Sequence, residues 1–131
     1  MGLEEKRAIK TAQDGWLPAK TKELAELSGG GGMTYEIDWA SFEGDVKGIE
    51  WLEFNGPQQV SNAFRQVGKD DVGKEALREA VKKVVIRNTK DEKDKTLSFE
   101  GGALTLVCAF AKSPGGRFKD SEIRDLLLKN L

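Results

Sequence analysis

Six carboxylates lie between residues 36 and 53, and only Lys47 offsets them. Carboxylates at strand spacing could hold a hard cation such as Mg²⁺ or Ca²⁺, form an acid–base pair, or attract a basic surface of another protein. The same pattern is also typical of the solvated face of a sheet. The six are Glu36, Asp38, Glu43, Asp45, Glu50 and Glu53.

The residues around this acidic stretch favour recognition over catalysis. It contains neither a DxDxDG-type calcium loop nor a glycine-rich phosphate loop beside an Asp or Glu pair. The chain has no histidine and one cysteine, Cys108, so nucleophiles activated by histidine and zinc sites built from Cys and His are excluded. We therefore expect no metal and no cofactor, and a binding role in preference to an enzymatic one.

A second, weaker candidate is the stretch from Lys112 to Lys119, which leads into a helix N-terminus. Backbone N–H groups at such a terminus favour anions, and Lys112, Arg117 and Lys119 would add positive charge there. The stretch matches neither the Walker A pattern nor GxGxxG, and Pro-Gly-Gly is common in turns. A turn is the stronger interpretation, and a phosphate or carboxylate site the weaker one.

The acidic residues and two tryptophans are expected to sit on one pair of strands. The spacing predicts strands over residues 34–39 and 47–53, joined by a turn at residues 43–45. Alternation would place Glu36, Asp38 and Glu50 together on the wet face. The inward side chains would be Tyr35, Ile37, Trp39, Ile49 and Trp51. We treat Trp39 and Trp51 as candidate lining of an aromatic pocket, although aromatic residues at strand spacing more often belong to a core.

The remaining pattern predicts an α+β domain. Helices are expected at the N-terminus, after Pro57, after Asp70 and near the C-terminus, with strands near residues 84–87 and 97–99. The run from Leu104 to Phe110 is apolar on both faces, which is typical of a central strand, and Cys108 within it should be buried and unreactive. The predicted order is α(α)-β-β-α-α-β-β-α, with a mainly antiparallel sheet of about four to five strands and helices on one face.

Length and charge limit the domain organisation and the partners. The 131 residues suit a single domain, in which residues 1–28 form a helical segment joined by the linker Gly29–Gly32. The 21 basic and 22 acidic side chains give a net charge of −1, which offers no general attraction to nucleic acid or an anionic membrane. The N-terminus lacks the apolar stretch of a signal peptide, so a cytoplasmic location is expected.

Two functional hypotheses follow from these patterns. The first is a non-enzymatic protein-binding module that acts through an acidic sheet face on a basic partner, or that forms a homo-oligomer. The alternative is a small-molecule-binding or enzymatic domain with an aromatic-lined pocket between sheet and helices. The missing histidine and the missing phosphate loops favour the first.

Overall fold

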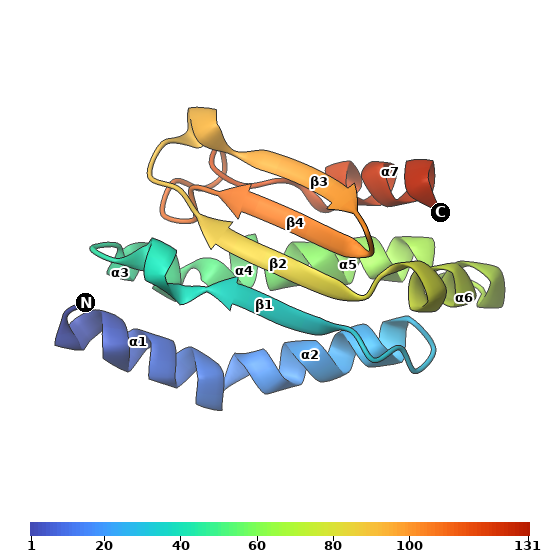
Figure 1. Cartoon of the computed structure of the whole chain (residues 1–131), viewed down its shortest axis with the longest axis horizontal. Coiled ribbons are helices and arrows are strands. Elements are labelled where there is room, and N and C mark those ends of the chain that lie inside the picture. Colours follow the sequence, from blue (N-terminus) through green and yellow to red (C-terminus); the bar gives the residue numbers. More distant parts are fainter.

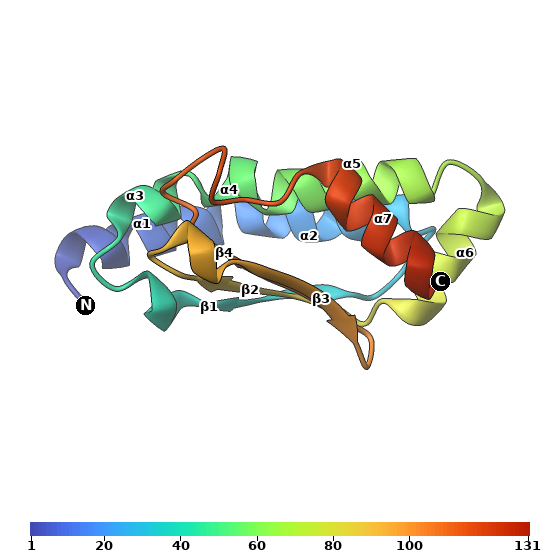
Figure 2. The ribbon, with the colours of Figure 1, turned by 90° about the horizontal axis from the view of Figure 1, so that it is seen from above.

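A four-stranded sheet with helices on one of its sides makes up the computed structural model, which describes residues 1–131 (Figures 1 and 2). The strand order is β1-β2-β4-β3. β1 is parallel to β2, β2 is parallel to β4, and β3 is antiparallel to β4. The strands are β1 (Thr34–Asp38), β2 (Lys83–Asn88), β3 (Thr96–Glu100) and β4 (Ala103–Cys108).

The helices form a single layer, and Figure 2 shows them all on the same side of the sheet. Two precede β1, four lie between β1 and β2, and one follows β4; short 3-10 turns, η1 and η2, follow β1 and β2. None of the helices combines the length and the hydropathy needed to cross a membrane. The elements are α1 (Leu3–Asp14), α2 (Trp16–Leu27), η1 (Trp39–Phe42), α3 (Val46–Glu50), α4 (Leu52–Asn55), α5 (Pro57–Val67), α6 (Asp71–Ala80), η2 (Glu92–Asp94) and α7 (Asp120–Asn130).

The core lies between the sheet and the helix layer. Alternate residues of β2 and β4 point into it, and Leu104, Leu106 and Cys108 are fully buried. They share one apolar cluster with Phe64 of α5 and Leu127 of α7. The position of β4 between β2 and β3 confirms the central strand that its sequence predicts. Such a strand contributes its buried side chains to the centre of the core.

The N-terminal helices belong to the same helix layer. α2 packs against α5 and buries Leu24 completely, while α1 packs against α3. The four glycines that follow α2 are held in place at their start, because the Arg78 guanidinium donates to the Ser28 and Gly29 carbonyl oxygens at 3.4 and 3.2 Å. The segment predicted as a linker therefore joins two packed elements, α2 and β1.

The second strand predicted over residues 47–53 is wrong, because the chain there forms α3 and α4. Asp45 caps α3, and its carboxylate accepts a hydrogen bond from the Gly48 N–H at 3.0 Å. Ile49 and Leu52 are buried three residues apart, as on a helix face. Trp51, which was expected to point inward, is 41% exposed.

This correction changes the sheet from mainly antiparallel to mostly parallel. With helices in place of the second strand, the chain from β1 to β2 is a long helical crossover, which suits a parallel pair. The only antiparallel pair is β3 with β4, closed by a turn at Gly101 and Gly102, whose φ angles are 58° and 82°. The sheet has four strands, and the α+β class and helices on one face agree with the prediction.

Candidate functional site

The carboxylates of β1 are paired on the open face of the sheet. Glu36 and Asp38 point away from the helices, next to β2. The Lys83 ammonium lies 2.8 Å from Glu36, and the Arg87 guanidinium lies 3.3 Å from Asp38. Each acidic residue thus has a basic neighbour, and this part of the sheet face is charge-balanced.

Glu50 and the two tryptophans lie in other surroundings. Glu50 ends α3 in the helix layer and is exposed, so it does not share a face with Glu36 and Asp38. Trp39 begins η1, is half-buried and packs against the core, with its ring 6.0 Å from that of Phe42. The structure therefore separates the predicted acidic face into a paired group on the sheet and an unpaired group on the helices.

The unpaired group borders a groove between α1 and α3. This hollow has a volume of about 590 Å³, with Ala8, Ala12 and Trp16 on the side of α1 and α2. Val46 and Ile49 of α3 face them across the groove. The walls also carry charged residues from both sides: Glu4, Arg7, Glu50 and Glu53. Apolar residues and carboxylates from four helices thus converge on one groove.

Two exposed aromatic rings extend this groove along α4. Trp51 and Phe54 are 41% and 61% exposed, and they line a second hollow of about 450 Å³ with Asn55. Glu50 lines both hollows, so they adjoin one another. We call the two hollows together the α1–α4 groove. Large aromatic side chains at a protein surface are common anchors of protein–protein contacts.

Three carboxylates and one basic residue line the α1–α4 groove, and two further cations lie over its aromatic rings. Glu4, Glu50 and Glu53 form no ion pair, in contrast to Glu36 and Asp38. Arg7 is the one basic residue among those that line the groove itself. Two further cations lie over the aromatic rings: the Lys47 ammonium is 4.3 Å from the centre of Trp51, and the Arg117 guanidinium is 5.0 Å from that of Phe54.

The three basic residues of the predicted anion site point to different places. Arg117 donates to Asn55 Oδ1 at 3.2 Å and so holds the loop before α7 against α4. Lys112 lines a separate hollow of about 290 Å³ with Lys90, at the ends of β2 and β4. Lys119 is exposed, and its N–H donates to Glu122 at the start of α7. The structure does not bring the three together.

The buried cysteine has no nucleophilic character. Cys108 lies in the core, and burial raises the pKa of its thiol to about 12. A thiol with such a pKa stays protonated at neutral pH, and the thiolate is the reactive form. No group of three or more His, Cys, Asp or Glu residues is arranged to hold a metal ion.

The sequence pointed to Glu50, Glu53 and Trp51 but not to the groove residues of α1. Phe54 and Trp16 belong to the aromatic residues that the sequence offers as possible pocket lining, although such residues more often belong to a core. Glu4 and Arg7 lie on α1, far from α3 in the chain, and only the packing of α1 on α3 brings them together. Comparison of the chain with protein-family models, curated proteins and solved structures finds no match.

Proposed function

We propose that this protein is a binding module whose α1–α4 groove takes a basic segment of a partner protein. The observation that carries the proposal is the set of three unpaired carboxylates beside an apolar floor and two exposed aromatic rings. The predicted role as an interaction module is kept, but the surface moves from the sheet to the helix layer. The partner segment would carry apolar anchor residues between Lys or Arg residues.

The apolar part of the groove supports anchoring. Ala8 and Ala12 are small, so the floor between α1 and α3 is open enough to receive side chains from outside. Trp51 and Phe54 offer ring surface that the chain itself leaves exposed. Helical or extended segments bind such grooves by inserting regularly spaced apolar residues. Burial of those anchors would supply most of the binding free energy.

The carboxylates support the choice of a basic partner. Glu4 stands on the α1 side together with Arg7, whereas Glu50 and Glu53 stand on the opposite side, so carboxylates lie on both walls of the hollow between α1 and α3. Charges placed around an apolar contact raise the association rate of an oppositely charged partner and suppress wrong ones. Their distribution on two walls suits recognition along a segment better than chemistry at one point.

Selection from displayed random peptides tests this proposal. Peptides selected on the immobilised protein should be enriched in Lys or Arg flanking Leu, Phe or Trp. Amide NMR shifts on adding one selected peptide should map to α1, α3 and α4. The double variant Glu50→Gln/Glu53→Gln should lower the affinity for that peptide about tenfold, because each lost charge pairing contributes roughly 1 kcal/mol or less at a solvated rim. Salt at about 0.5 M should lower the peptide affinity of the wild type by a similar factor.

A matched control removes the same charge from the sheet face. Glu36→Gln/Asp38→Asn eliminates two carboxylates outside the groove, and it should leave the peptide affinity unchanged. Trp51→Ala should weaken binding without a change of net charge. Selection of neutral or acidic peptides, or equal weakening by both double variants, would show that the groove is not the binding site.

A further inference from the structure

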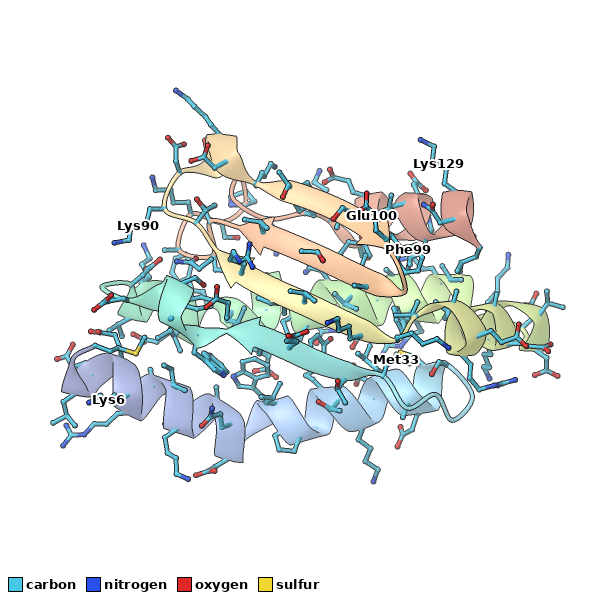
Figure 3. The ribbon with its side chains drawn as sticks, viewed as in Figure 1. Lys6, Met33, Lys90, Phe99, Glu100 and Lys129 are labelled. Carbon is cyan, nitrogen blue, oxygen red and sulfur yellow. The ribbon has the colours of Figure 1, made fainter.

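The face of the sheet opposite the helices is left open, although its strands are mostly parallel. Sheets with parallel strands are normally covered on both sides. Figure 3 looks onto this face, with Glu100 at its β3 edge. The outward residues, strand by strand, are Thr34, Glu36 and Asp38 on β1; Lys83, Val85 and Arg87 on β2; Ala103, Thr105 and Val107 on β4; and Thr96, Ser98 and Glu100 on β3.

The middle of this open face combines four small side chains with two long basic ones. Val85 of β2 and Ala103, Thr105 and Val107 of β4 are half-buried and small. Lys83 and Arg87 flank Val85 on β2, and charged and hydroxyl side chains line both edge strands. Where two sheets pack face to face, short and β-branched side chains such as these four interdigitate.

We propose that the open face binds the same face of a second copy of this chain, about a twofold axis parallel to the strands. With the axis between β2 and β4, β2 of one copy lies over β4 of the other, and β1 lies over β3. The strand register then decides which residues meet. A twofold interface is self-complementary, so each contact occurs twice.

This arrangement places a hydroxyl opposite every carboxylate. Within one sheet, the strand register places Glu36 and Ser98 at the same level along the strands, and likewise Asp38 and Thr96. Across the axis, Glu36 therefore faces Ser98 of the second copy, and Asp38 faces Thr96. Glu100 faces Thr34 in the same way. Hydroxyl groups donate hydrogen bonds to carboxylates, so these edges are complementary.

The outward side chains of the two central strands, β2 and β4, are complementary in length. The long side chains of Lys83 and Arg87 face the short Ala103 and Val107 of the second copy, and Val85 faces Thr105. The charges of Lys83 and Arg87 are already balanced within each copy by Glu36 and Asp38. A twofold axis perpendicular to the strands would instead stack each strand on itself and put Glu36 opposite Glu36, which is unfavourable.

The size of the face predicts a weak dimer. Four strands at a spacing of about 4.8 Å and five residues at about 3.3 Å give a flat area of roughly 300 Å². Stable interfaces bury about 800 Å² per partner. Even with the long side chains at the edges, we expect a dissociation constant on the order of 10–100 µM.

Sedimentation equilibrium at increasing protein concentration tests the dimer. The wild-type mass should rise from monomer to dimer across the micromolar range. Val85→Glu places a charge in the centre of the face and should keep the protein monomeric at every concentration. Val72→Glu is the matched control, since Val72 is 78% exposed on α6 in the helix layer, and it should dimerise as the wild type does.

A second variant guards against a folding defect in the first. Thr105→Lys places a long cation opposite Val85 and should also abolish the dimer, while circular dichroism and melting temperature report the fold. A wild type that stays monomeric at about 500 µM, above the expected dissociation constant, would overturn the proposal. So would a dimer that persists in folded Val85→Glu or Thr105→Lys, because another surface would then be responsible.

Discussion

At the scale of single residues, Tyr35 carries a polar atom without a partner. Its ring packs against the core from β1, and its hydroxyl is buried and makes no hydrogen bond. Burial, and to a smaller extent the Glu23 carboxylate, raises the pKa of Tyr35 well above its ordinary value. The ring therefore stabilises the fold, whereas the hydroxyl opposes it.

Replacement of Tyr35 by Phe should consequently not weaken the fold. Removal of a buried hydroxyl that has no partner should raise the free energy of unfolding by about 1 kcal/mol, measured by urea denaturation. Tyr35→Ala is the control, because it removes the ring as well and should cost about 3–5 kcal/mol. A loss of more than about 1 kcal/mol in Tyr35→Phe would mean that the hydroxyl has a stabilising partner in solution.

Single residues also show what could be predicted from the sequence. Alternation around Cys108 predicted its burial correctly, because every second residue of a strand shares one face. The pairing of Glu36 and Asp38 with Lys83 and Arg87 could not be predicted. It depends on which strand lies beside β1, and nothing near residues 36–38 in the chain specifies that neighbour.

At the scale of elements, the first turn of α6 lies very close to the end of α5. A Cβ added to Gly73 would overlap the Val67 carbonyl oxygen. The Asp70 carboxylate accepts a hydrogen bond from the Gly73 N–H at 2.8 Å and caps the helix at the same point. A residue without a side chain is therefore needed where the two helices turn.

Gly73→Ala should reverse the usual effect of this substitution in a helix. Alanine normally favours a helix over glycine by about 1 kcal/mol, but here the collision should destabilise the protein by about 1–3 kcal/mol. Gly32→Ala is the matched control, since nothing lies within 4 Å of its added Cβ. Thermal and urea unfolding of the two variants measure the difference. Equal stability would show that α5 and α6 separate at little cost.

The apolar residues of the segment predicted as a strand over residues 47–53 fit two periodicities, that of a strand and that of a helix. Ile49 and Trp51 alternate as in a strand, yet Val46, Ile49 and Leu52 recur every three residues as in a helix. Asp45 before Val46 is a capping signal that favours the helix. The helical interpretation is therefore available from the sequence, although the alternation of Ile49 and Trp51 alone favours a strand.

At the scale of the whole molecule, the position of β4 limits the topology. A strand that is apolar on both faces needs neighbours on both sides, so β3 and β2 could not pair with each other across it. The short connection from β2 to β3 reverses the chain, and β3 is antiparallel to β4, so β2 and β4 run parallel. Helices on a single face of the sheet were predicted, whereas the places where α1 and α2 pack in that layer could not be, since nothing near them in the chain specifies α3 and α5 as neighbours.

The two proposed surfaces lie on different sides of the molecule and would act together. The α1–α4 groove belongs to the helix layer, near the end toward which β1, β2 and β4 run (Figure 1). A twofold axis parallel to the strands preserves the strand direction in both copies. A dimer formed through the open face would thus present two grooves at one end, each free to bind a basic segment.

Such a dimer should hold a surface that carries many copies of one selected basic peptide far longer than a monomer does. Linked sites raise apparent affinity by about 10²–10⁴ when both can engage at once. At protein concentrations above the dimer dissociation constant, the wild type should leave a densely coated biosensor at least about tenfold more slowly than Val85→Glu. The two should bind the free peptide equally, because Val85 lies on the sheet face and not in the groove.

On a sparsely coated surface the difference should vanish, since one dimer then reaches one peptide, and Val72→Glu should follow the wild type throughout. Equal dissociation of the wild type and Val85→Glu from the dense surface would show that the two grooves do not act as a pair.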